Sequence, residues 1–325
     1  VYSVPLAFDR ARTVALCIIP SVIICHYFIQ RGDNDIFPLA LVIAGIAMAL
    51  YVIVHYGGLS SFYTQASKEG ARLGGEVVQE NNLGLEAGYS TITVFFFTLK
   101  KKKKYILLLA VFPFIVAMAS GSRKALITIV LGVISLTFLM KKDKSFTPSM
   151  LLKMIFTTFA MVIIALLLSK LPIMVTIIER TQEMFDFFFT GKGDHSTWLR
   201  SKMIEAGMKE FPKHPFFGIG FNNANYINAR YTGHFTYLHN DYIEQLINLG
   251  ICGIILYYGN FLIIFKKHIN LIANADESIF LSLVFFIVFL INATGHVFYY
   301  NKVAYLFFTY WISNIYINES NLKNK

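Results

Sequence analysis

The sequence is poor in charge and rich in apolar residues. Only 15% of its 325 residues are charged, whereas 56% are hydrophobic, and the mean hydropathy is +0.56. A soluble domain of this length would not carry so many long apolar runs. The alternating pattern of a transmembrane β-barrel is absent as well. We therefore expect helices, which satisfy their backbone N–H and C=O groups internally in lipid.

Cysteine is scarce, which limits the possible chemistry. The chain has three cysteines, and Cys17, Cys25 and Cys252 all lie inside apolar runs. Cys17 and Cys25 fall on one expected helix about 12 Å apart, too far for a disulfide. No spacing of His and Cys typical of a metal site occurs. The sequence thus predicts neither a metal nor a cofactor.

Nine apolar runs are candidate membrane spans, although several are short. They cover about 14–30, 36–56, 84–99, 105–119, 124–140, 151–171, 242–264, 278–299 and 303–317. The chain thus divides into membrane helices at 1–171, a large polar loop at 172–241 and further membrane helices at 242–325. Because nine spans place Val1 outside and no Met precedes it, we expect this set to be incomplete at its N-terminus.

Lysine clusters in short connectors predict the orientation. They lie at 100–104, 141–144, 266–267 and 323–325. Such connectors remain in the cytoplasm, so the segments that alternate with them are expected to face outward, namely 57–83, 120–123, 172–241 and 300–302. Arg10 and Arg12 then lie outside, against the usual bias. The net charge of +10 is mainly this orientation signal and does not indicate nucleic-acid binding.

Two of the outer segments carry polar residues suited to a ligand. The segment 57–83 starts with two glycines and is either an ordinary glycine-rich turn region or part of a binding site. In the second case the side chains of Arg72 and Asn82 would contact the substrate. The turn at 120–123 is followed directly by Lys124. Arg123 and Lys124 either snorkel to headgroups or bind an anion, for which a guanidinium fork is well shaped. Ser122 would add backbone donors beside a helix start.

The large loop contains one clear helical pattern. From Ser196 to about Phe211, Leu199, Met203 and Ala206 form an apolar row. Lysines near one face predict an amphipathic helix on the outer membrane surface. Arg200 lies in the first helical turn, where the helix dipole already favours an anion.

The residues after this helix are compatible with a binding loop. His214 and Pro215 are followed by Gly218 and Gly220, which permit close approach of the backbone to a ligand. At the end of the loop, His239 precedes Asn240, Asp241 and Glu244. This histidine is either a structural hydrogen-bonding residue or a group that transfers protons near neutral pH, with the carboxylates orienting its ring.

In order and spacing, these residues resemble the superfamily of O-antigen polymerases and O-antigen ligases, which includes the Wzy-type polysaccharide polymerases and their ligase relatives. The resemblance spans about 57–260. Its specific parts are Ser122-Arg123, Arg200 ahead of His214-Pro215, Gly218-Ile219-Gly220, and His239-Asn240-Asp241-Tyr242 followed by Gly250 and Gly253. Lys124, Ile204 and Asn248 depart from residues common in the family.

The resemblance implies an all-α polytopic membrane protein similar to GT-C-type glycosyltransferases. It implies inverting, metal-independent glycosyl transfer in which Arg123 and Arg200 hold a pyrophosphate and His239 accepts a proton, the three converging on one diphosphate. Substrate contacts are expected from the following residues: Arg72, Asn82, Ser122, Lys124, His214, Gly218, Gly220, Asn240 and Asp241.

The same resemblance implies where the protein acts and on what. The expected place is the bacterial cytoplasmic (inner) membrane, with the active site facing the periplasm or cell exterior. The donor would be an oligosaccharide on undecaprenyl pyrophosphate, used to build O-antigen or another surface polysaccharide. A chain-length regulator and a flippase of the same pathway are further expected partners. Polymerase leads because the segment starting at Gly57 resembles those of repeat-unit polymerases.

Two alternatives remain. A ligase would transfer the finished glycan to the lipid A core of lipopolysaccharide by the same chemistry. A transporter without enzymatic activity would place ionisable residues near mid-membrane, whereas Glu86, Lys153 and Lys170 lie near span ends.

Overall fold

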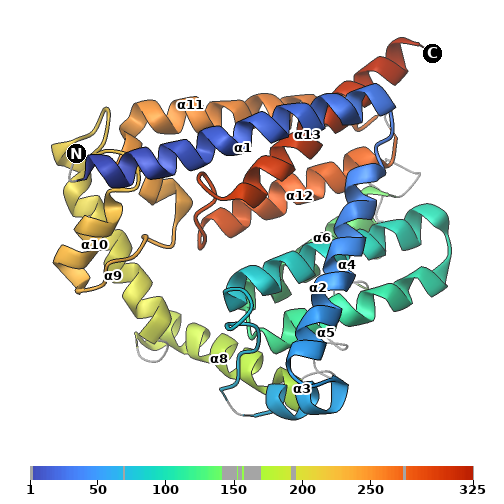
Figure 1. The fold of residues 1–325 in the computed structure, drawn as a ribbon, viewed down its shortest axis with the longest axis horizontal. Coiled ribbons are helices and arrows are strands. Elements are labelled where there is room, and N and C mark those ends of the chain that lie inside the picture. Colours follow the sequence, from blue (N-terminus) through green and yellow to red (C-terminus); the bar gives the residue numbers. More distant parts are fainter. Residues whose placement is uncertain are drawn as a thin grey trace. The chain divides into compact units, whose positions relative to one another are not determined.

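Every regular element in the described residues is a helix (Figure 1). The computed structural model describes residues 3–68, 70–140, 170–191, 195–273 and 276–324, together with Leu152 and Phe156. They form two compact units, Asp35–Gly193 and a second that joins Val1–Asn34 to Asp194–Lys325. The span predicted at 151–171 lies almost wholly outside the described residues.

The first unit is built around one helix. Its elements are α2 (Ile36–His55), α3 (Leu59–Ala66), α4 (Glu80–Lys101), the 3₁₀ turn η1 (Lys104–Ala110), α5 (Val111–Ala119), α6 (Arg123–Leu139), the 3₁₀ turn η2 (Pro172–Met174) and α8 (Val175–Thr190). Helix α4 packs against α2, α5 and α6.

Small residues allow these helices to approach closely. A Cβ on Gly45 would lie 2.2 Å from Ser90 Oγ, and one on Gly132 would lie 2.3 Å from Ile92 Cδ1. Close contact of this kind is how helices associate in lipid, where no hydrophobic effect drives them together. An ion pair of 2.8 Å between Lys100 and Asp35 joins the end of α4 to the start of α2.

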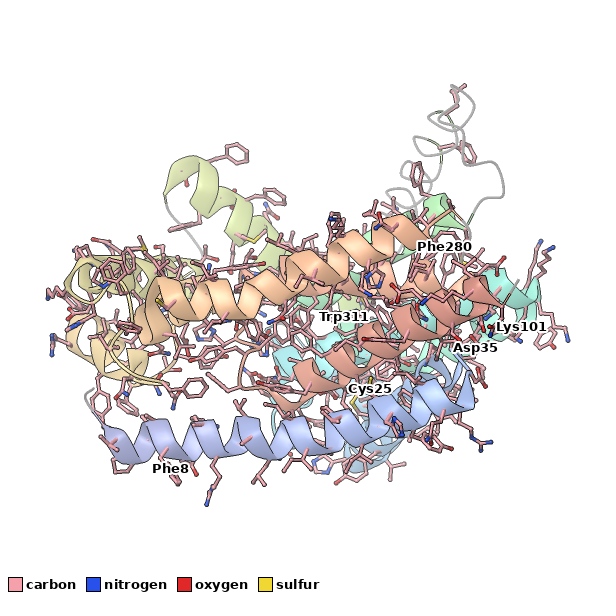
Figure 2. The ribbon with its side chains drawn as sticks, turned by 90° about the horizontal axis from the view of Figure 1, so that it is seen from above. Phe8, Cys25, Asp35, Lys101, Phe280 and Trp311 are labelled. Carbon is pink, nitrogen blue, oxygen red and sulfur yellow. The ribbon has the colours of Figure 1, made fainter. Side chains whose placement is uncertain are left out.

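The second unit consists of two packed groups of helices. Its elements are α1 (Val4–Arg31), α9 (His195–Glu210), the 3₁₀ turn η3 (Phe211–Lys213), α10 (Ala224–Thr232), α11 (Asp241–Leu271), α12 (Ser278–Ala293) and α13 (Lys302–Lys323). Trp311 of α13 (Figure 2) lies against Phe286 and Phe289 of α12 with ring centroids 5.2 and 5.3 Å apart. These aromatic contacts form the larger core.

The helix predicted from Ser196 to Phe211 is confirmed as α9. Its row of Met203 and Ala206 is buried with Ile227 and Leu238 in a small apolar cluster, and Leu199 packs against it. The row therefore packs within the protein, which differs from the membrane-surface placement expected from the lysines.

Three described helices are long and apolar enough to cross a membrane, namely α1, α2 and α11. Helix α1 has no buried residue, and its Phe8 is 70% exposed and points away from the rest of its unit in Figure 2. Such a surface is suited to lipid rather than water. Other predicted spans coincide with helices, but a total of nine spans stays a prediction. Helix α1 begins at Val4, earlier than expected, because Ser3 Oγ accepts the N–H of Leu6.

Helix α11 is interrupted at Gly250, which has φ 68° and ψ −169°. The main chain of 215–220 replaces the lost helical hydrogen bonds. The N–H groups of Ile219 and Gly220 donate to the carbonyls of Ile247 and Asn248 at 2.9 and 3.0 Å. In return, Ile251 and Cys252 donate to Pro215 and Phe216 at 2.9 and 3.1 Å. A break in an apolar helix is tolerated where other protein groups satisfy its backbone.

We expect Gly250→Ala to destabilise the protein by more than about 2 kcal/mol. The backbone conformation of Gly250 is essentially restricted to glycine and costs another residue about 1–3 kcal/mol, and the Cβ of alanine would lie 2.3 Å from the carbonyl oxygen of Phe216. The control is Gly259→Ala in the same helix, where a Cβ has open space. The midpoint of thermal unfolding in detergent should fall for Gly250→Ala and stay or rise for the control. Equal midpoints would contradict this account of the break.

Candidate functional site

The turn that joins α5 to α6 is the structural centre of the first candidate site. Ser120 Oγ donates to the carbonyl of Ala117 at 2.7 Å and accepts the N–H of Ser122 at 3.3 Å. Gly121 adopts φ 61°, a conformation that favours glycine. Gly84 of α4 lies directly under the turn, because a Cβ there would be 2.5 Å from Ser120 Oγ. The turn is therefore held tightly against α4.

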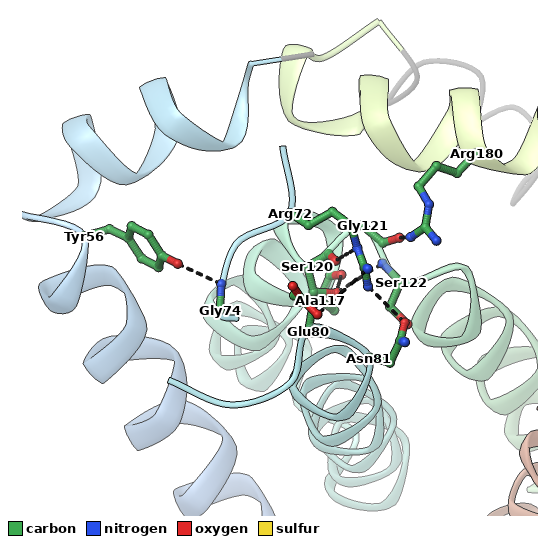
Figure 3. A network of polar contacts seen from close by, with 10 residues as sticks. All are labelled: Tyr56, Arg72, Gly74, Glu80, Asn81, Ala117, Ser120, Gly121, Ser122 and Arg180. Carbon is green, nitrogen blue, oxygen red and sulfur yellow. Dashed lines mark hydrogen bonds and ion pairs between the residues drawn. The ribbon is translucent and has the colours of Figure 1, made fainter. Parts of the chain in front are cut away.

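Three arginines, from the loop before α4, from α6 and from α8, meet at this turn, and Figure 3 shows two of them, Arg72 and Arg180. Arg72 donates through Nε to the carbonyl of Ser120 at 3.3 Å and through a terminal nitrogen to Asn81 Oδ1 at 3.0 Å. Arg180 of α8 donates to the carbonyl of Gly121 at 2.7 Å. Arg123, only 8% exposed, donates to the carbonyl of Arg180 at 2.6 Å. We call Arg72, Arg123 and Arg180 the arginine cluster.

The charges of the cluster act on one another. Burial lowers the pKa of Arg72, the carboxylate of Glu80 opposes that shift, and the positive charge of Arg123 lowers the pKa further. Glu80 lies 3.8 Å from the Arg72 guanidinium. Repulsion between two guanidinium groups is relieved by a bound anion, since an opposite charge nearby favours the charged form.

Hydrogen-bonding capacity also remains around the turn. Asn82 Oδ1, Ser122 Oγ and Thr176 Oγ1 are buried without a hydrogen-bond partner among the described residues. Thr176 lies against the turn, 3.4 Å from the position of a Cβ on Gly121. Buried polar atoms are normally satisfied by protein, water or ligand. These atoms, together with the first N–H groups of α6, suit an oxygen-rich ligand.

Five residues predicted from the sequence thus lie in this one unit: Arg72, Asn82, Ser122, Arg123 and Lys124. The predicted outer segments 57–83 and 120–123 contact each other at the turn. Arg180 was missed by sequence reasoning. It lies within a polar helix at the start of the large loop, and only its approach to Gly121 in space distinguishes it from other charged residues.

The second group of predicted residues surrounds the start of α11 in the other unit. His239 has φ 57°, and its ring centroid is 4.1 Å from that of Tyr237. Asn240 caps α11, because its side chain accepts the N–H of Ile243 at 3.1 Å, and it also donates to the carbonyl of Thr294 at 3.3 Å. The backbone of His239 is therefore fixed directly before a helix N-terminus.

Asp241 is completely buried and holds another loop in place. Its carboxylate accepts the N–H groups of Phe298 and Tyr299 at 2.6 and 3.1 Å. It also accepts the Tyr258 hydroxyl at 2.5 Å and the Gln245 amide at 2.6 Å. The carboxylate thus links α11 to the segment after α12. Its expected roles, orienting the His239 ring and binding substrate, stay predictions.

Glu244 and α9 fix the residue before His239. Glu244 accepts the N–H of Leu238 at 2.7 Å. Leu238 also lies against α9, since a Cβ on Gly207 would be 3.1 Å from its Cδ1. Arg200 lies seven residues earlier on α9, about 10 Å along the helix axis. Arg200 and His239 thus belong to one packed group.

His214, Gly218 and Gly220 lie in the segment that completes α11. A Cβ on Gly218 would be 2.4 Å from the carbonyl carbon of Asn248, and Gly220 donates to the carbonyl of Asn248. The close backbone approach predicted from these glycines exists, but its partner is the chain itself. The carbonyl of His214 accepts the N–H of Gly218 at 3.1 Å. A substrate contact by these three residues stays a prediction.

Arg123 lies in one unit, whereas Arg200 and His239 lie in the other. The convergence of all three on one diphosphate therefore stays a prediction.

The long apolar helices and their exposed apolar faces define a helical membrane protein. A family model described as O-antigen ligase matches residues 106–258. This match supports the superfamily of O-antigen ligases and polymerases, whose general activity is glycosyl transfer with lipid-linked glycans in a membrane. The matched region includes Arg123, Arg180, Arg200 and His239. No curated protein matches the chain.

Replacing Asp241 with Ala should lower the free energy of unfolding by about 3 kcal/mol or more, because buried donors on Phe298, Tyr299 and Tyr258 would lose their acceptor. The control, Glu205→Ala, removes a carboxylate that pairs with Lys202 and Lys209 on the exposed face of α9. Exposed pairs of that kind contribute little. Unfolding in detergent measures both variants, and a stable Asp241→Ala protein would refute the scaffolding role.

Proposed function

We propose that this protein polymerises oligosaccharide repeat units carried on undecaprenyl pyrophosphate, by glycosyl transfer at the outer face of the bacterial cytoplasmic membrane. The observation that carries the proposal is the arginine cluster around the Ser120–Ser122 turn. Three guanidinium groups, a helix start and buried polar atoms without partners suit a ligand with several negatively charged oxygens. A diphosphate has this chemistry.

The arginine cluster would act on the leaving group. As the bond between the donor sugar and the diphosphate breaks, negative charge grows on the departing diphosphate. Fixed cations in a partly buried site stabilise that charge without reorganising, which typically lowers a barrier by several kcal/mol. In this proposal the guanidinium groups of Arg72, Arg123 and Arg180 supply the positive charge, and no metal is required.

His239 would act on the attacking group. The acceptor hydroxyl oxygen forms the new bond to the anomeric carbon, the bond from that carbon to the diphosphate breaks, and the hydroxyl proton passes to the imidazole. A positioned base of this kind typically contributes a factor of about 10²–10⁴. The bonds from Glu244 and Asn240 to the residues flanking His239 keep its backbone in place. Arg200, on the helix packed against this loop, would add a further contact to phosphate.

The acceptor separates the two enzymatic alternatives. A polymerase transfers the donor glycan to a second lipid-linked repeat unit, whereas a ligase transfers it to the lipid A core. A flippase that delivers repeat units and a regulator of chain length would work beside either enzyme. A transporter would use the same arginines to line a path and would need no proton acceptor at His239.

We expect single replacements Arg72→Ala, Arg123→Ala, Arg180→Ala and His239→Ala to reduce long surface polysaccharide at least tenfold in a host lacking the gene. The matched control is Arg31→Ala, an exposed arginine at the end of α1. Gel electrophoresis of the polysaccharide and immunoblotting of membranes measure the outcome. Full-length polysaccharide in all four variants, at normal protein levels, would refute the proposal.

The residual products distinguish polymerase from ligase and transporter. Loss of a polymerase leaves a single repeat unit on the lipid core, whereas loss of a ligase leaves none there and accumulates lipid-linked glycan. With purified wild-type protein and a lipid-linked donor, elongation in detergent supports a polymerase. Since a transporter forms no glycosidic bond, product formation without a membrane excludes that alternative.

A further inference from the structure

A groove on the second unit combines an apolar floor with two cations at one end. It has a volume of about 410 Å³ and lies between α1 and α13. Its apolar wall includes Leu16, Pro20 and Ile24 of α1 and Leu306 of α13, while Arg12 and Lys302 lie at its end. Lys302 is the first residue of α13, and Arg12 lies in the N-terminal half of α1. The two helices contact each other through a hydrogen bond of 3.2 Å from Thr309 to the carbonyl of Ser21.

The charge at this end is positive. Arg12 forms an ion pair of 2.7 Å with Asp9 on the exposed side of α1. Arg12, Lys302 and Asp9 together carry a net charge of +1, since two are cations and one is an anion. Clusters of Lys and Arg at a membrane interface attract anionic lipid headgroups. Arg10, whose guanidinium lies 5.2 Å from the ring centroid of Tyr300, adds a further positive charge beside this end. The match is therefore to an anionic headgroup.

The length of the groove matches one leaflet of a bilayer. From Arg12 to Ile24 it follows twelve residues of α1, which is about 18 Å along the helix axis. The hydrocarbon core of a bilayer is about 30 Å thick, so one leaflet is about 15 Å. An acyl chain that enters beside the cations reaches the end of the groove, whereas a polyprenyl chain that spans more than one leaflet exceeds it.

The position of the cations explains an anomaly of the sequence. Arg12 and Lys302 lie on the side predicted to face outward, where positive residues are normally rare. Helix α1 has no buried residue, so its apolar face is open to hydrocarbon in the part of the chain that the structure describes. A lipid in the groove would satisfy the charges and the apolar wall together.

We propose that the groove between α1 and α13 is a binding site for an anionic phospholipid of the surrounding membrane, such as phosphatidylglycerol. The phosphate lies between Arg12 and Lys302, and one acyl chain lies along Leu16, Pro20, Ile24 and Leu306. None of the residues that line this groove belongs to the arginine cluster.

Native mass spectrometry of the full chain tests the proposal. Protein purified in mild detergent is titrated with phosphatidylglycerol, phosphatidylcholine or undecaprenyl phosphate. One Lys or Arg near an anionic lipid contributes a factor of about five in affinity. The variant Arg12→Gln/Lys302→Gln should therefore bind phosphatidylglycerol about 25-fold more weakly. Its control, Arg31→Gln/Lys323→Gln, removes two cations from the opposite ends of the same helices and should bind like wild type.

A second variant tests the apolar wall without changing charge. Leu306→Trp fills the groove and should weaken phosphatidylglycerol binding at least fivefold, with an unfolding midpoint close to that of wild type. The proposal would be overturned if the Arg12→Gln/Lys302→Gln variant bound phosphatidylglycerol as tightly as wild type. It would also be overturned if the control double variant lost as much affinity for this lipid. Preferential binding of undecaprenyl phosphate would also overturn it, because the groove would then be a substrate site.

Discussion

The main-chain pairing between the segment 215–220 and the break in α11 is the constraint on which the second unit depends. A helix interrupted at Gly250 leaves backbone groups that lipid cannot satisfy. Four hydrogen bonds satisfy them: the carbonyls of Pro215 and Phe216 accept two, and the N–H groups of Ile219 and Gly220 donate two. This pairing fixes the break in α11, and the side chain of Asp241 fixes the loop after α12. His239 directly precedes the start of the same helix.

The first unit is subject to a different constraint, because the positively charged guanidinium groups of its arginine cluster lie close together. Arg72 and Arg123 come close enough for one to lower the pKa of the other, although repulsion opposes their assembly. The Ser120–Ser122 turn holds Arg72 and Arg180 through its carbonyl groups, and the carbonyl of Arg180 in turn accepts a hydrogen bond from Arg123. Such repulsion around unsatisfied polar atoms is the arrangement that the proposed binding of an anion would relieve.

Much of this arrangement was predictable from the sequence. Hydrophobic runs indicate the membrane helices, helical spacing predicts α9 closely, and the motif residues around Arg123 and His239 indicate the superfamily. The role of Arg180 was not predictable, because its contact with Gly121 joins residues far apart in the chain. The structural role of Gly218 was not predictable either, because a glycine permits close approach of the backbone to a ligand and to another backbone segment equally well. Only coordinates distinguish the two.

The pairing at the break in α11 has an evolutionary consequence. Its hydrogen bonds use backbone atoms alone, so they constrain the path of the chain but few of the side chains it bears. Phe216 and Phe217, inside the paired segment, are 64% and 79% exposed. Mutation can therefore change these exposed side chains while the main-chain pairing stays intact.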